Sequence, residues 1–168
     1  STKKSLIINI NNSPNKEEIS KLLMRFNKIK NKNLYPNLIN DLFFYLKYFK
    51  EHILHFECRY NNKLIALRTI ITMNDKSWDL FALSDEIARV KYANNNLIHF
   101  IFLKLIEKKI RFFDFSGVDK KNNKGVFNFK NGTGCRFITT NNEFIYSKSF
   151  YIKYIFILYL YIKRNKNV

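Results

Sequence analysis

Residues 112–136 read FFDFSGVDKKNNKGVFNFKNGTGCR and contain all four glycines of this 168-residue chain. The beta-branched and aromatic run 110–115 predicts a buried strand, which stops at Ser116-Gly117. A polar loop follows, and then a short amphipathic piece over 126–130, closed by the turn residues 131–134. Glycines this close to aromatic residues indicate sharp turns of the backbone, or its close approach to another group.

The sequence before this stretch predicts a strand, two helices and three more strands. The strands are expected over 6–10, 54–60, 63–73 and 78–83, and the helices over 16–30 and 37–50. The first helix opens at Lys16, with either Ser13 or Asn15 as its N-cap. Asn61-Asn62 predicts a tight hairpin between the second and third strands, because asparagine tolerates a positive φ.

Two further helical segments are expected in the second half of the chain. Residues 84–96 form a polar connection, and residues 97–108 are apolar nearly all round, which predicts a buried central helix. The strand and short amphipathic piece of 112–136 come next, followed by two final strands. The aromatic run 150–164 has nine uninterrupted apolar residues after Lys153, too few to span a bilayer. It suits a helix on a membrane surface, or one packed on this domain or on a neighbouring one.

Composition limits the classes of protein and of site. The length predicts one domain, and 46% hydrophobic with 17% aromatic residues excludes a disordered chain. Cys58 and Cys135 are far apart and fit reduced thiols, and no cysteine or histidine spacing predicts a metal site. The formal charge of +17 has two explanations, an AT-rich genome that favours lysine or an anionic partner such as nucleic acid. The start at Ser1 indicates a lost initiator methionine or a fragment.

The glycine-rich stretch also carries a family resemblance. Asp-Phe-x-Gly at 114–117, followed by Phe-Lys-x-Gly-x-Gly at 129–134, resembles the FemABX transferases, which are relatives of the GNAT acyltransferases. These enzymes add amino acids or acyl groups to amines of cell-envelope precursors. The predicted order of elements is similar to the GNAT-type sheet independently of this motif, including two helices between the first two strands. The resemblance implies an α/β fold with a mixed, mostly antiparallel sheet flanked by helices, and a GNAT-like domain over 1–148. The aromatic and basic composition of 149–168 predicts a separate C-terminal helix.

The resemblance also implies a catalytic role for Lys130. In the family, the Phe-Lys pair that Phe129-Lys130 matches places an ammonium over the reacting carbonyl, where it stabilises the oxyanion of acyl transfer. The alternative is a solvated lysine on a short helix. Asp114 matches a family aspartate and either orients the following loop, holds a lysine or acts as a general base. Gly132 and Gly134 either bring the backbone close to the substrate or the sheet, or form an ordinary turn.

The binding residues follow from the same resemblance. The GNAT pyrophosphate loop, Arg/Gln-x-x-Gly-x-Gly/Ala, is missing before the central helix, where residues 91–96 stand instead. This agrees with FemABX proteins and weakens an acetyl-CoA assignment, although that helix N-terminus remains a candidate for binding an anion. Basic residues on the first helix are either phosphate ligands or a solvated face. The candidate substrate-binding residues are Arg25, Lys28, Lys30, Tyr92, Gly117, Phe129, Gly132 and Gly134.

Together these features predict an N-acyl or aminoacyl transferase that acts on an amine of a cell-envelope precursor. Its donor would be aminoacyl-tRNA or an acyl-CoA or carrier thioester, with no metal and no tightly bound cofactor. Two alternatives are a CoA- or carrier-dependent sugar N-acyltransferase and a non-catalytic basic module that binds RNA or membranes. The expected location is cytoplasmic and peripheral at the plasma membrane. The expected partners are a nucleotide- or lipid-linked precursor, tRNA and the N-terminal half of a longer chain.

Overall fold

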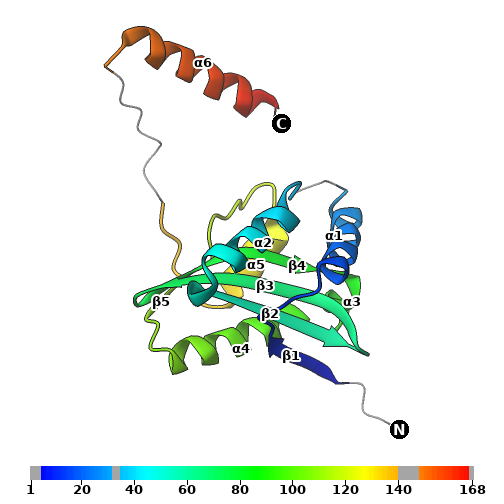
Figure 1. The fold of residues 1–168 in the computed structure, drawn as a ribbon. Coiled ribbons are helices and arrows are strands. Elements are labelled where there is room, and N and C mark those ends of the chain that lie inside the picture. Colours follow the sequence, from blue (N-terminus) through cyan, green and yellow to red (C-terminus); the bar gives the residue numbers. More distant parts are fainter. Residues whose placement is uncertain (1–4, 32–34, 140–147, 167–168) are drawn as a thin grey trace. The chain divides into compact units, whose positions relative to one another are not determined.

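One five-stranded sheet organises the first part of the chain. The computed structural model describes residues 5–31, 35–139 and 148–166, and the strands lie in the order β1-β2-β3-β4-β5 (Figure 1). The strands are β1 (Leu6–Ile10), β2 (Ile53–Tyr60), β3 (Lys63–Met73), β4 (Lys76–Ser84) and β5 (Phe112–Asp114). The first four pair antiparallel and β5 pairs parallel to β4, which confirms the mixed, mostly antiparallel sheet.

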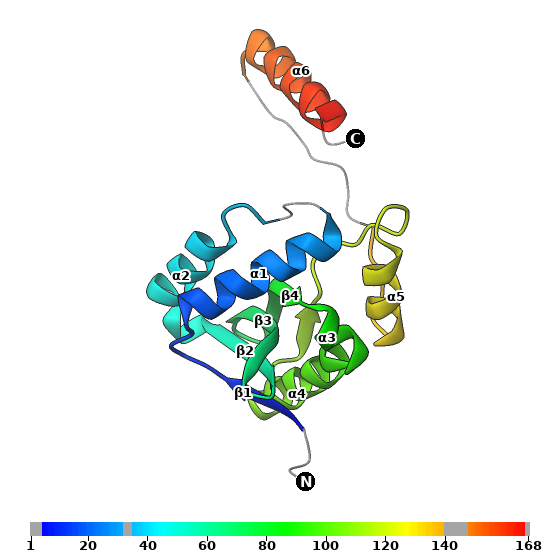
Figure 2. The same cartoon turned by 90° about the vertical axis from the view of Figure 1, so that its right-hand side faces the viewer.

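Helices cover both faces of this sheet. Helices α1 and α2 lie on one face and α4 on the other (Figures 1 and 2). The helices are α1 (Lys16–Lys30), α2 (Leu38–Tyr48), the 3-10 helix η1 (Lys50–His52), α3 (Glu86–Val90), α4 (Ala93–Glu107), α5 (Lys124–Gly132) and α6 (Phe150–Lys166). The chain divides into two compact units, residues 1–127 and 128–168, and each is described by itself.

The core beneath α1 and α2 follows from the spacing of their apolar residues. Ile19, Leu22 and Phe26 recur at three- and four-residue intervals, so they share one side of α1 and are buried there. They pack with residues of α2, β3 and β4, namely Leu38, Leu42, Leu64, Leu67 and Leu83. Asn15 is the N-cap of α1, since its side-chain oxygen accepts hydrogen bonds from the backbone N–H groups of Glu17 and Glu18.

Helix α4 packs on the other face of the sheet, and it begins earlier in the sequence than predicted. The ring of Phe100 lies edge-on to Phe56 of β2, with centroids 6.1 Å apart. The prediction of an all-round buried helix is wrong, because Leu103 and Ile106 are 46% and 70% exposed. A helix on one face of a sheet contacts it along one side only. The predicted polar connection over 84–96 is also wrong in part, since it contains α3 and the first turn of α4.

The predicted hairpin turn is found in the structure, whereas the last strand differs from its prediction. Asn61 and Asn62 have φ values of 50° and 61°, which confirms the predicted hairpin between β2 and β3. Strand β5 covers three residues, and Phe112 is 54% exposed, so the predicted buried strand over 110–115 is wrong in length and burial. It lies at the sheet edge, with a neighbouring strand on one side.

The C-terminal part of the chain is described for 135–139 and 148–166. The helix expected over 150–164 is confirmed as α6. Of the two predicted final strands, residues 135–139 form none, and 140–147 lie outside the described residues. Among the described residues, no helix combines the length and apolar character that crossing a bilayer requires. The proposed domain boundary at residue 148 stays a prediction.

Candidate active site

Strands β4 and β5 part from each other soon after they meet. Their parallel pairing covers Lys76 with Phe112, Ser77 with Phe113 and Trp78 with Asp114. Beyond Trp78, no strand among the described residues pairs with β4 on this side, although β4 continues to Ser84 (Figure 1). We call β4 residues 79–84, together with β5, the open edge. Successive backbone groups of a strand point to opposite sides, so β4 directs N–H and C=O groups toward the side that β5 has left. A ligand with amide groups can pair with such an edge.

A bulge in β4 lies at the beginning of the open edge. Thr69 of β3 pairs with Phe81 and the next residue, Ile70, pairs with Asp79. Leu80 therefore has no opposite residue on β3. An extra residue bends a strand and increases its local twist, and such bulges are frequent beside active sites. The bulge thus stands where the two strands separate, and it disrupts the ladder at that point.

A buried charged pair joins β3 to the bulge. Arg68 and Asp79 are 5% and 9% exposed and form an ion pair through Nη1 and Oδ2. Burial raises the pKa of Tyr35, and the negative charge of Asp79 raises it further. A phenol and an ion pair therefore stand close to the bulge. The sequence analysis missed this group, although an aspartate within the run WDLFAL, in an otherwise largely apolar strand, was an available signal.

The predicted site residue Asp114 stabilises the turn that ends β5. It is exposed, and its Oδ1 accepts a hydrogen bond of 2.7 Å from the backbone N–H of Ser116. Ser116 has a φ of 62°, and its hydroxyl donates to the carbonyl oxygen of Asp79 at 2.6 Å. The turn therefore connects the end of β5 to Asp79 of β4, next to the bulged residue Leu80. A general-base role for Asp114 stays a prediction.

Lys130 is a buried cation on α5. Its residue surface is 6% exposed, so the alternative of a solvated surface lysine is wrong. Its carbonyl oxygen accepts hydrogen bonds from the hydroxyl of Thr133 at 2.6 Å and from the thiol of Cys135 at 3.1 Å. Phe129, beside it, is half-buried. Because burying an ammonium is costly unless its surroundings compensate the charge, a buried lysine is a candidate functional group.

Of the glycines considered for the site, Gly134 is the one whose backbone conformation favours glycine. Gly134 has a φ of 76°, which residues other than glycine adopt at a cost. A Cβ atom added to Gly117, Gly132 or Gly134 would meet no heavy atom within 4 Å. These glycines are therefore not required by close packing within the protein. Their close approach to a substrate stays a prediction.

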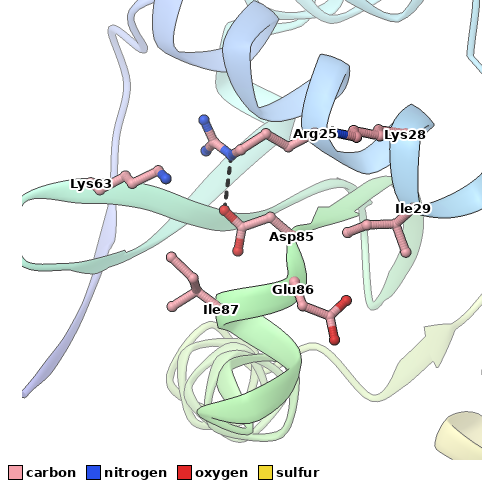
Figure 3. A pocket seen from close by; sticks show the side chains of 7 residues that line it. All are labelled: Arg25, Lys28, Ile29, Lys63, Asp85, Glu86 and Ile87. Atoms are coloured by element: carbon pink, nitrogen blue, oxygen red, sulfur yellow. Dashed lines mark hydrogen bonds and ion pairs between the residues drawn. The ribbon is translucent and has the colours of Figure 1, made fainter.

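Two of the three predicted phosphate ligands line one cavity beside α1. The cavity has a volume of about 200 Å³ and lies between α1, the start of β3 and α3 (Figure 3). Its lining residues are Arg25, Lys28, Ile29, Lys63, Asp85, Glu86 and Ile87. Lys30 is not among them, and its ammonium lies 5.9 Å from the ring of Phe26. The cavity therefore brings three cations together with two carboxylates that the sequence analysis did not include.

Arg25 has partners of its own in this cavity. Its Nε donates to Asp85 at 2.9 Å (Figure 3). Its Nη2 donates to the carbonyl oxygen of Leu64 at 2.6 Å. Asp85 also accepts from the backbone N–H of Ala88, which makes it the N-cap of α3. These bonds connect α1 to β3 and to the end of β4. Arg25 therefore has a structural role, whether or not it binds an anion.

Tyr92 stands where the predicted anion-binding turn begins. It precedes α4 with a φ of 53°, and its side chain is 72% exposed. Asn94 in the same turn donates to the hydroxyl of Ser84 at 3.1 Å, which ties the helix N-terminus to the end of β4. Holding a tyrosine in the left-handed region costs free energy, and such strain is frequent at functional sites.

Cys58 is poorly suited to be a nucleophile. Cys58 is fully buried, and burial raises the pKa of its thiol to about 11, so the reactive thiolate is scarce at neutral pH. Within residues 5–31, 35–139 and 148–166, no group of three histidine, cysteine, aspartate or glutamate residues is arranged to hold a metal ion.

Known proteins resemble this chain in structure and not in sequence. No protein-family model and no curated protein matches it. An aminoglycoside acetyltransferase from an uncultured soil metagenomic sample, in complex with sisomicin, matches with a TM-score of 0.64 at 15% identity, over 86% of this chain and 97% of that one. The PaiA N-acetyltransferase of Thermoplasma acidophilum, in complex with coenzyme A, matches with a TM-score of 0.64 at 16% identity, over 82% and 94%.

A third structure carries the family name in its description. It is an acetyltransferase of the GNAT family from Staphylococcus aureus Mu50, with a TM-score of 0.62 at 16% identity, over 80% of this chain and 87% of that one. At these identities the likeness shows a shared fold. The chain therefore has the fold of the GNAT acetyltransferases, and this part of the resemblance seen in the sequence is confirmed.

Proposed function

We propose that this chain is an N-acyltransferase and that its acyl donor binds along the open edge of β4. The observation that carries the proposal is the early separation of β5 from β4 beside a bulge. A donor arm with amide groups, such as that of coenzyme A, is able to pair with the backbone groups that β4 directs to that side. The coenzyme A complex of the similar Thermoplasma protein supports a thioester donor.

The reaction needs a nucleophile, a stabilised oxyanion and a path for one proton. The amine nitrogen attacks the carbonyl carbon of the donor, the tetrahedral intermediate expels the thiolate or alkoxide, and the amine gives up a proton to a base. Lys130 keeps the oxyanion-stabilising role predicted from the sequence, and its burial supports this role, since a charge acts more strongly in a medium of low dielectric constant. Asp114 keeps the role of candidate base.

The proposal also covers the chemical class of the acceptor and of the donor. The FemABX resemblance of residues 114–134 favours an amine on a cell-envelope precursor and aminoacyl-tRNA as an alternative donor. The likeness to an aminoglycoside acetyltransferase bound to sisomicin favours a second acceptor class, the amino sugars. Both acceptor classes present an unhindered amine, so the same chemistry serves either one.

Hydrogen exchange tests donor binding separately from transfer. Acetyl-CoA, aminoacyl-tRNA and free tRNA are added in turn, and amide exchange is followed by mass spectrometry. A bound donor is expected to slow exchange in peptides that cover β4 residues 79–84 and to leave β2 unchanged. If neither donor protects this segment, the open edge is not the donor site. Protection by free tRNA alone, without transfer, would favour the RNA-binding module.

Lys130→Met tests the catalytic assignment, with Lys124→Met on the same helix as a matched control. Transfer of a labelled acyl group to muropeptide precursors and to an aminoglycoside is measured for each variant. We expect Lys130→Met to lower kcat by about 10²–10³ with donor protection retained, because one oxyanion donor is lost. Lys124 is exposed, so its replacement is expected to leave the rate unchanged. An unchanged rate in Lys130→Met would remove this lysine from the mechanism.

A further inference from the structure

Helix α6 is apolar around its whole circumference. Between Phe150 and Ile162, every residue except Lys153 is aromatic or aliphatic. Tyr151 and Ile155 are 79% and 68% exposed, and most of the other large side chains in this run are exposed as well. A helix of this composition is unfavourable in water, because its apolar surface has no polar side to present to solvent.

A flat protein surface covers only part of such a helix. Neighbours on one side of a helix recur at three and four residues, so a flat surface contacts about half of the circumference. In α6 the residues that remain on the other half are again isoleucine, leucine, phenylalanine and tyrosine. Whichever half packs against protein, the remaining half still requires an apolar environment, and this environment must follow the helix along its length.

The charges of α6 identify the chemistry of that environment. The basic residues of the helix are Lys153, Lys163, Arg164 and Lys166, and neither aspartate nor glutamate occurs in it. Four tyrosines lie among the apolar residues, and tyrosine favours the boundary between lipid headgroups and acyl chains. A helix with lipid-soluble side chains, tyrosines and only positive charges is complementary to a bilayer that contains anionic lipids.

The length of the apolar run determines how the helix meets the bilayer. The uninterrupted segment after Lys153 has nine residues, which extend about 14 Å at 1.5 Å per residue, against roughly 30 Å of hydrocarbon. The segment is therefore too short to cross the bilayer, so only part of its circumference meets the acyl chains at the bilayer surface. We propose that α6 is a membrane anchor that binds the surface of anionic lipid bilayers.

Vesicle flotation tests this proposal with the full chain and no acyl donor, so the result is independent of the proposed enzymatic function. Vesicles of phosphatidylcholine alone are compared with vesicles that contain phosphatidylglycerol, each at low and high salt. The chain is expected to float with the anionic vesicles and to be released in part by salt, because each basic residue contributes about fivefold to binding at the surface.

Two double variants, each with a matched control, separate the apolar from the electrostatic contribution to vesicle binding. Ile155→Glu with Leu158→Glu is expected to abolish flotation, while the same exchange at exposed Ile7 and Met73, outside α6, is expected to preserve it. Lys163→Gln with Arg164→Gln is expected to weaken binding to anionic vesicles about 25-fold. Lys120→Gln with Lys121→Gln removes equal charge from an exposed loop and is expected to have a smaller effect.

Three results would overturn the proposal. The first is equal flotation with neutral and anionic vesicles, and the second is flotation that persists in the Ile155→Glu, Leu158→Glu chain. The third is no flotation with anionic vesicles at all. A dimer that the same two glutamates dissociate would then assign α6 to a second copy of this chain. Thermal unfolding of each variant shows that the domain remains folded during these comparisons.

Discussion

The two halves of the sheet use the same kind of strand for different purposes. In the half formed by β1, β2 and β3, which we call the paired half, each strand pairs along most of its length, and residues on both faces of β2 and β3 are buried. At the open edge, β5 pairs with β4 at one end only and Phe112 is largely exposed. The paired half therefore holds the fold, whereas at the open edge the pairing of β5 with β4 ends at Trp78.

The polar residues of the paired half serve structure. Buried Glu57 accepts hydrogen bonds from Asn11 at 2.9 Å and from Arg59 at 3.0 and 3.1 Å. Arg59 also bonds both carboxylate oxygens of Glu18 on α1, and His55 bonds Thr69 at 2.7 Å. Most polar atoms of this network have partners within the protein, while the Nε2 atom of His55 is buried without a hydrogen bond to the described residues and lies 3.6 Å from Glu57. Function is expected where pairing is incomplete.

The largest effect should come from emptying the core of the paired half. Leu67 is fully buried in the core beneath α1, so Leu67→Ala is expected to lower the free energy of unfolding by about 3 kcal/mol. The matched truncation at the open edge, Phe112→Ala, is expected to cost less than about 1 kcal/mol, because that ring is half in solvent. Urea unfolding measures both. Similar losses at the two positions would contradict the distinction.

An intermediate effect is expected for the residue that ties the two halves together. Arg25 bonds the carbonyl oxygen of Leu64 at the start of β3 and Asp85 just beyond β4, so Arg25→Ala is expected to cost about 2 kcal/mol of stability. Lys28→Ala, in the same cavity, is expected to change stability by less than about 0.5 kcal/mol, because Lys28 is exposed. If Arg25→Ala unfolds like the unaltered chain and only ligand binding weakens, Arg25 is a ligand and not a structural residue.

The smallest effect is a pH dependence within the paired half. Burial by itself raises the pKa of Glu57, but the nearby imidazole of His55, hydrogen bonds from Arg59 and Asn11 and the charge of Arg59 outweigh it, so the pKa lies below its usual range. The stabilisation is therefore complete above the unfolded-state pKa near 4.3 and is lost as pH falls through the folded-state value. Glu57→Gln is expected to cost about 1 kcal/mol at pH 7.

That cost should shrink in acid, when the glutamate of the unaltered chain becomes protonated. Urea unfolding at about pH 7 and about pH 3.5 measures the difference between the unaltered chain and the variant. Glu51→Gln serves as the control, since Glu51 is exposed. A Glu57→Gln cost that stays constant between the two pH values would show that ionisation of Glu57 contributes nothing to stability.

Prediction from the sequence succeeded where neighbours in the chain set the structure. Leu6–Ile10, Lys16–Lys30 and the Asn61-Asn62 hairpin follow from alternation, helical spacing and the tolerance of asparagine for positive φ, and all three are confirmed. The five-residue helix α3 was missed, because its apolar residues are too few to establish a period. The order of these elements was enough to predict the GNAT-type sheet that the similar structures confirm.

Some features of the candidate site were likewise visible in the sequence, and others required the tertiary structure. Lys130 and the glycines around it are visible as a motif, since their spacing is local, but the burial of Lys130 is not a property of the motif. The bulge at Leu80, the pair of Arg68 with Asp79 and the separation of β5 depend on which residues of different strands lie opposite each other. Register and burial arise from contacts between segments distant along the chain, which local patterns do not encode. The amino-acid sequence thus specifies the elements and their order, while folding in three dimensions creates the open edge.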